Sequence, residues 1–123
     1  MKRLFLFLPL LLLVACLPGR KPAETLLIPA DSIIPEAQMV LLLADAHTIE
    51  AALVIARNKG KNTRDIGNYY YAGLFKKYGI SQEKYKQNLA YYREDPDTFI
   101  KLYEEVNREL KNREKNFVGS SSN

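Results

Sequence analysis

From residue 34 onward, glycine and proline residues divide the chain into segments that are too short for one continuous helix. Gly60, Gly79 and Pro96 separate stretches in which apolar residues recur at three- and four-residue intervals, the spacing of an amphipathic helix. Proline lacks the amide donor that a helix interior needs, and glycine favours the left-handed conformation that ends a helix. No segment alternates as a half-buried strand would. The sequence therefore predicts an all-α fold, a small bundle of about four helices.

Start and stop signals give the bounds of these helices. We expect them at about residues 35–57, 66–78, 82–93 and 96–116. Gly79 is predicted to end the second helix in a left-handed conformation, and Ser81 to cap the third. Asp95, followed by Pro96, is the clearest start signal. The first helix is predicted to carry one continuous face, formed by Met39, Val40, Leu43, Ala46, His47, Glu50 and Val54.

Aromatic residues recur at every seventh position in the second half of the chain. Positions 71, 78, 85 and 92 are tyrosine, 99 is phenylalanine and 106 is valine. A coiled coil would give this spacing, but Gly79 and Pro96 interrupt any continuous helix. We expect these side chains to pack in and around a small core, and the alternative is a surface on which sugars stack.

The first fifteen residues have the pattern of a secretory signal peptide. Lys2 and Arg3 precede an apolar run, residues 4–15, that spans about 18 Å as a helix and is too short for a hydrocarbon core of about 30 Å. The run ends in Leu-Val-Ala-Cys, which looks like a bacterial lipobox. In proteins with this motif the signal is cut before the cysteine, here between Ala15 and Cys16. The cysteine then carries diacylglyceryl and acyl chains such as palmitate.

Residues 16–32 are predicted to be the lipidated cysteine and an extended tether, because three prolines and a glycine exclude a regular helix. Leu17 is not the aspartate that retains many lipoproteins in the inner membrane. No short acidic run, which would resemble a surface-export signal, follows the cysteine. We therefore expect a protein of the cell envelope, held by the lipid on Cys16 at the periplasmic face of the outer membrane.

Composition excludes several classes of function. The formal charge is +4, and outside residues 1–15 there are 16 basic and 14 acidic residues, which is too balanced for a nucleic-acid partner. One histidine cannot form a multi-histidine metal site, and the only thiol is Cys16. Glycine-rich phosphate loops and serine nucleophile motifs are not found in the sequence. We expect no cofactor, no metal and no nucleic acid.

Asp45, His47 and Glu50 form the one candidate polar cluster. On a helix, His47 and Glu50 share a face one turn apart, whereas Asp45 points elsewhere. We expect His47 and Glu50 to be a buried polar pair, bonded to a tyrosine hydroxyl or a loop backbone, that fixes how helices dock. The alternative is a small envelope hydrolase that uses His47 and Glu50, with carboxylates completing a metal site. Asp45 is expected to pair with an arginine or lysine of a neighbouring helix, or to be solvated.

Three stretches of the sequence together resemble a known family. The first is Pro35-Glu36 with a D-x-H-x-x-E-A motif at residues 45–51. The second is Phe75-Lys-Lys-Tyr-Gly-Ile-Ser81, followed by Tyr85, Leu89, Tyr91 and Tyr92, and the third is the helix that contains Pro96, Tyr103, Val106 and Leu110. The resemblance, over about residues 33–114, is to the family of domain of unknown function 4296, small lipoproteins found mostly in Bacteroidota. It implies an all-α lipoprotein and implies no activity.

The expected organisation has four parts. They are a signal peptide at 1–15, the lipidated cysteine and tether at 16–32, a helical domain at 33–116 and a disordered tail at 117–123. With no catalytic constellation, the favoured function is a non-enzymatic, lipid-anchored module that binds an envelope protein or a glycan. The hydrolase based on His47 and Glu50 is the alternative.

Overall fold

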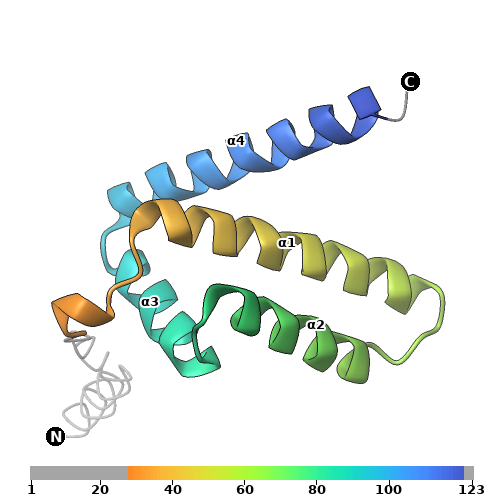
Figure 1. The fold of residues 1–123 in the computed structure, drawn as a ribbon, viewed down its shortest axis with the longest axis horizontal. Coiled ribbons are helices and arrows are strands. Elements are labelled where there is room, and N and C mark those ends of the chain that lie inside the picture. The colour runs from red at the N-terminus through yellow and green to blue at the C-terminus, as the bar shows by residue number, and fades with distance from the viewer. Residues whose placement is uncertain (1–27, 121–123) are drawn as a thin grey trace, which may run out of the picture.

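The computed structural model describes residues 28–120, which form four α-helices preceded by a short 3-10 turn (Figure 1). The turn covers Ala30–Ser32, and the helices are α1 (Glu36–Asn58), α2 (Thr63–Tyr78), α3 (Gln82–Glu94) and α4 (Pro96–Ser120). Residues 28–120 contain no strand, so the predicted all-α class is confirmed. The predicted signal peptide, Cys16 and the tether as far as residue 27 lie outside the described residues.

The most apolar helix, α1, lies in the middle of the bundle (Figure 1). It packs against α2 on one side and α4 on the other, and α3 packs against α4. α3 lies at the end where α1 begins, and the α1–α2 turn forms the opposite end. α1 and α4 run in the same direction and move apart toward their C-terminal ends.

Local capping sets the helix boundaries much as the sequence predicts. Gly79 ends α2 with a φ of 63°, in the left-handed region. The Ser81 side chain accepts a hydrogen bond from the Lys84 amide at 3.0 Å and so begins α3. Asp95 begins α4, because its carboxylate accepts from the Asp97 amide at 3.2 Å and from the Thr98 hydroxyl. These caps agree with the predicted signals.

α2 begins three residues earlier than expected. The side chain of Asn62 accepts a hydrogen bond from the Arg64 amide at 3.0 Å, which satisfies one of the free donors at the helix start. The apolar spacing of this helix begins only at Ile66, so it does not reveal the earlier start. The cap, and not the apolar pattern, decides where α2 starts.

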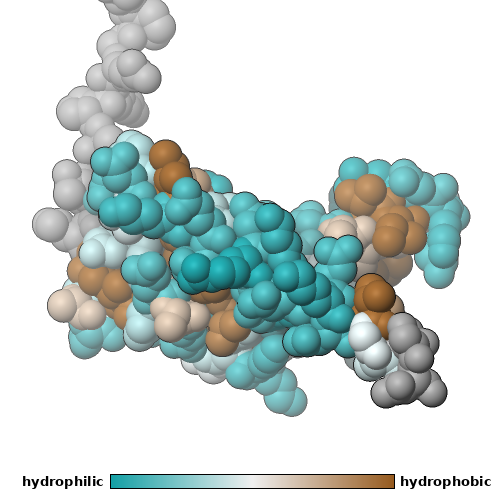
Figure 2. Space-filling model, turned by 90° about the horizontal axis from the view of Figure 1, so that it is seen from above, coloured by the Kyte–Doolittle hydropathy of each residue, from teal (hydrophilic) through white to brown (hydrophobic). Residues whose placement is uncertain are grey.

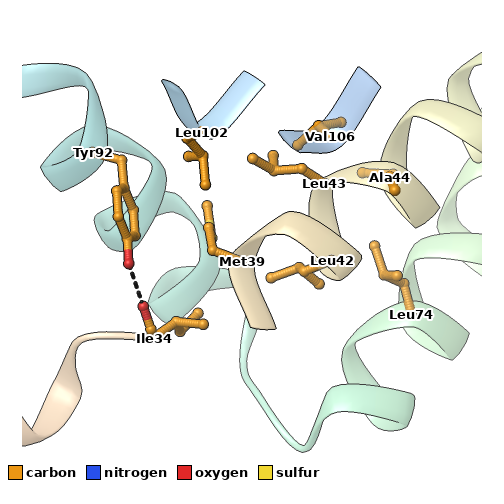
Figure 3. Close-up of a cluster of buried hydrophobic side chains, with 10 residues drawn as sticks. Ile34, Met39, Leu42, Leu43, Ala44, Leu74, Tyr92, Leu102 and Val106 are labelled. Carbon is orange, nitrogen blue, oxygen red and sulfur yellow. Dashed lines mark hydrogen bonds between the residues drawn. The ribbon is translucent and has the colours of Figure 1, made fainter. Parts of the chain in front are cut away.

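The buried face of α1 is wider than the single stripe that the sequence predicts. Its buried residues are Met39, Leu42, Leu43, Ala44, Ala46 and Leu53. Leu42 points toward Leu74 of α2, whereas Leu43 lies beside Val106 of α4 (Figure 3). α2 and α4 therefore each bury a separate stripe of α1. Val54 was expected on the buried face and is 49% exposed, because α4 has moved away from α1 at that level.

The seven-residue aromatic spacing reflects core packing, as predicted. Tyr92 and Val106 belong to the buried core, and Tyr71, Tyr78, Tyr85 and Phe99 pack against it half-buried. They come from all of the helices except α1, so one heptad register runs through three separate helices. Tyr69, Tyr70 and Tyr91 are exposed.

The chain enters the bundle through hydrogen bonds to α3. The fully buried Asn88 accepts from the Ile34 amide at 2.7 Å and donates to the carbonyls of Ser32 at 3.1 Å and Lys84 at 2.9 Å. The Tyr92 hydroxyl donates to the Ile34 carbonyl at 2.7 Å (Figure 3). The prediction of an extended tether up to residue 32 is therefore wrong for its last residues, since α3 supplies partners for their backbone.

α4 also extends further than expected. The tail predicted at 117–123 is wrong for residues 117–120, which continue the helix. No proline follows Pro96, and residues 111–118 contain mostly residues that tolerate a helix. Arg113 further supports this part of α4 through its bond to Glu109, one turn earlier, at 2.7 Å. Residues 121–123 lie outside the described part.

Replacing Asn88 with leucine tests this entry point. The substitution leaves the buried Ile34 amide without a partner, so the free energy of unfolding should fall by about 3 kcal/mol. Tyr92→Phe, which removes one hydroxyl and keeps the ring, should cost only about 1 kcal/mol. Urea unfolding followed by circular dichroism measures both. An Asn88→Leu protein that is no less stable than Tyr92→Phe would contradict the assigned role.

Candidate functional site

Asp45 joins three helices. From the middle of α1, its Oδ2 accepts hydrogen bonds from the Lys77 Nζ at 2.7 Å and from the Tyr78 hydroxyl at 2.9 Å, both on α2. Its Oδ1 accepts from Nη1 of Arg113 on α4 at 2.6 Å. The Asp45 side chain is only 15% exposed. Asp45 thus has cationic partners on neighbouring helices, the first of the two environments that the sequence leaves open.

The network around Asp45 shifts the pKa values of its members. Burial alone would raise the pKa of Asp45, but the hydrogen bonds from Lys77, Arg113 and Tyr78 outweigh burial and leave the pKa below its ordinary value. Burial and the hydrogen bond to Asp45 raise the pKa of Tyr78 to about 12. At neutral pH the carboxylate is therefore charged and the phenol neutral, which is the state that the hydrogen bonds need.

His47 and Glu50 contact different helices. Glu50 accepts a hydrogen bond from the hydroxyl of Tyr71 on α2. The ring of His47 lies edge-on to Tyr103 of α4, with ring centroids 5.6 Å apart. Both residues are exposed, so their expected burial is wrong, whereas the expected hydrogen bond to a tyrosine hydroxyl is present for Glu50. At this level of α1 the face between α2 and α4 is open, which a single helix pattern cannot reveal.

The chemistry of this face follows from these contacts. Burial and the hydrogen bond to Glu50 raise the pKa of Tyr71 above its ordinary value, so its hydroxyl stays neutral and donates. Within residues 28–120, no three His, Cys, Asp or Glu side chains lie close enough together to hold a metal ion. The arrangement fixes the Tyr71 ring against α1.

Tyr71 also lines a surface depression between α2 and the start of α3. The depression has a volume of about 250 Å³ and is lined by Asn68, Tyr71, Ala72, Phe75 and Gln82. The rings of Tyr71 and Phe75 lie 5.9 Å apart, and Tyr85 backs Phe75 at 5.7 Å. We call this the α2–α3 depression. It combines aromatic surface with two side-chain amides.

The two amides of the α2–α3 depression are available to a ligand. Among residues 28–120, neither Asn68 nor Gln82 makes a side-chain hydrogen bond, and both are exposed. Sequence reasoning missed this site. The available signal was the helical spacing of Asn68, Tyr71 and Phe75, which places them on one face of α2. Gln82 comes beside them only because Gly79 reverses the chain, and this needs the tertiary structure.

A second depression lies between α1 and α2 beside Asp45. It has a volume of about 270 Å³, its wall is mostly apolar, and Ile49 and Leu74 are among the residues that line it. Gly73 also lines it, and a Cβ at that position would have no atom within 4 Å. Its main polar groups, Asp45 and Lys77, are bonded to each other. It offers a ligand fewer free polar groups than the α2–α3 depression does.

Asp45→Asn should destabilise the fold in a pH-dependent way. Because the folded-state pKa of Asp45 is depressed, its contribution is present above its ordinary pKa of 3.8 and is lost as the pH falls through the lower folded value. At neutral pH the substitution should lower the free energy of unfolding by about 2 kcal/mol. Each kcal/mol lost should lower Tm by roughly 4–8 °C in a domain of this size. As the pH falls from about 4 through the lower folded pKa, the stabilities of the two proteins should converge.

Thermal unfolding across this pH range measures the effect, with Glu104→Gln as the control. Glu104 is exposed on α4 and forms no ion pair among residues 28–120. Its substitution should change Tm little at any pH. A constant difference between wild type and Asp45→Asn at neutral and acidic pH would contradict the role of the charge.

Comparison with known proteins places the chain in a family. No curated protein and no solved structure matches it. The model of the family described as domain of unknown function (DUF4296) matches residues 30–116. This range takes in the 3-10 turn, the Asp45 network and the α2–α3 depression, and it confirms the resemblance found in the sequence. The chain therefore belongs to the DUF4296 family.

Proposed function

We propose that this protein is a non-enzymatic, lipid-anchored module of the cell envelope that binds a glycan through the α2–α3 depression. The observation that carries the proposal is the combination of the Tyr71 and Phe75 rings with the unbonded amides of Asn68 and Gln82. The apolar faces of sugar rings pack on aromatic side chains. Amides donate and accept hydrogen bonds at once, as sugar hydroxyls require.

The depression is suited to bind without a large change of shape. Tyr71 is held by its hydrogen bond to Glu50, and Phe75 is wedged between Tyr71 and Tyr85. Side chains that are already fixed lose little conformational entropy when a ligand arrives. The volume of about 250 Å³ is small, so the proposed ligand is one or two sugar rings of a longer chain.

Support for the anchor comes from the sequence alone. The Leu13–Cys16 lipobox and the absence of an acidic run after it favour lipidation of Cys16 and a place at the periplasmic face of the outer membrane. Two or more acyl chains suffice for stable anchoring. A glycan-binding domain held there would face the envelope polymers.

The hydrolase alternative has less support from the contacts. Glu50 is bonded to Tyr71, and His47 lies against Tyr103. A general base must reach the proton that it takes. The Glu50 carboxylate is already engaged by the Tyr71 hydroxyl. We therefore keep binding as the proposed activity.

Cys16→Ser tests the anchor. Without the thiol there is no site for the diacylglyceryl group, so the protein should lose acylation and be found either uncleaved or in the soluble fraction. Fractionation of cells, with mass spectrometry of the N-terminus, measures this. A Cys16→Ser protein that still fractionates with membranes after cleavage would refute the lipoprotein assignment.

Asn68→Ala combined with Gln82→Ala tests the glycan site. The double substitution removes the hydrogen-bonding groups and keeps the rings, so affinity should fall about tenfold or more. The probe is a set of solubilised peptidoglycan fragments and envelope polysaccharides, with binding measured by calorimetry. Asn107→Ala with Asn112→Ala, two exposed amides on α4, is the matched control and should bind as wild type does. Absence of binding to every glycan, or equal loss in both variants, would overturn the proposal.

A further inference from the structure

The α1–α2 turn carries a dense group of cations. Arg57, Lys59, Lys61 and Arg64 fall within eight positions, and no acidic residue occurs between Glu50 and Asp65. All four side chains are exposed. The ion pairs within residues 28–120 use Lys77, Arg108 and Arg113, and none of these four cations takes part in one. This group of charges is therefore not neutralised by the fold.

Two aliphatic side chains lie beside these cations. Val54 and Ile55, in the last turns of α1, are 49% and 56% exposed. Figure 2 shows apolar atoms bordered by hydrophilic atoms at this end of the molecule. We call residues 54–64 the basic tip. Its composition, cations around exposed aliphatic groups, differs from that of an ordinary solvated turn.

The basic tip has a defined backbone conformation. Gly60 adopts a φ of 72°, and the amides of Lys59 and Lys61 both donate to the Ala56 carbonyl, at 3.1 Å and 3.0 Å. This pattern closes the C-terminus of α1 with a left-handed glycine. The Asn62 cap then starts α2 at once. The cations are thus presented from a fixed backbone, which limits the entropy lost on binding.

We propose that the basic tip docks on the surface of an anionic phospholipid bilayer. Exposed lysine and arginine side chains are attracted to phosphate headgroups, and exposed aliphatic groups enter the boundary between headgroups and acyl chains. Arg57, Lys59 and Lys61 provide the cationic side chains, and Val54 and Ile55 provide the aliphatic groups. A nucleic-acid backbone would use the cations but offers no partner for the two aliphatic side chains.

The position of the tip is compatible with a second membrane contact in an anchored chain. The tip lies at the opposite end of α1 from the point where the chain enters the bundle (Figure 1). α1 has 23 residues and is roughly 35 Å long. The eleven residues 17–27 reach at most about 40 Å. A domain attached through Cys16 has enough chain to lie with its tip on the same bilayer.

Vesicle binding by residues 28–120 tests the proposal without any lipid anchor. This part includes the described core, whose members all lie between Ile34 and Leu110, and circular dichroism first verifies that it is helical. It should co-sediment with vesicles of phosphatidylglycerol and phosphatidylcholine, and not with phosphatidylcholine alone. High salt should weaken the binding. Because Cys16 is absent, this result is independent of whether Cys16 is acylated.

Charge reversal at the tip gives the matched comparison. Lys59→Glu with Lys61→Glu should weaken binding to the anionic vesicles about tenfold or more. Lys86→Glu with Lys101→Glu makes the same change of net charge on α3 and α4, and should leave most of the binding intact. Equal loss in the two variants would mean attraction to the whole protein and would overturn a tip-specific site.

Val54→Ser with Ile55→Ser separates a bilayer from other polyanions. These substitutions leave the charge unchanged and remove the groups that would enter the bilayer, so binding to the anionic vesicles should fall several-fold. Unchanged binding would overturn the proposal, as would failure of wild type to bind anionic vesicles. Binding to duplex DNA in the absence of vesicle binding would assign the tip to nucleic acid instead.

Discussion

The burial of α1 is the constraint on which the rest of the structure depends. An 18-residue window of this helix has a mean hydropathy of 1.8, which by length and composition alone would suffice to cross a membrane. In the bundle, α2 and α4 cover two sides of α1, and its buried residues form the centre of the core. α3 contributes Tyr92 to this core, with Tyr85 packed against it, and it receives the incoming chain.

Polar contacts at the edge of this core decide how the helices are placed. Apolar burial is nondirectional, so it does not by itself fix the rotation of one helix against another. Asp45 fixes this rotation, since its two carboxylate oxygens are bonded to donors on both α2 and α4. The Glu50–Tyr71 contact adds a second directional link between α1 and α2. It also holds one ring of the α2–α3 depression, so the same link that orders the fold shapes the proposed binding surface.

Sequence reasoning succeeded where the physical cause is local. The left-handed Gly79 and the caps at Ser81 and Asp95 depend on a few neighbouring residues, and the structure has each of them. It was less successful where the cause is tertiary. The second buried stripe of α1 needs knowledge of two neighbours, and Asn88 lies in a polar stretch that resembles a solvated helix face. The burial expected for His47 and Glu50 is wrong for the same reason, because the pattern of one helix does not show that this face of α1, between α2 and α4, is open.

The attachment of residues 30–34 to α3 has a mechanical consequence. Any tension in the chain that precedes residue 28 reaches the folded bundle at this point. The backbone of Ser32 and Ile34 passes it to the side chains of Asn88 and Tyr92, which lie 54 to 58 positions further along the sequence. The load therefore enters through α3 as well as through the start of α1. A pull must break these hydrogen bonds before it can peel α1 from its neighbours, so they act as a mechanical clamp that shields the core.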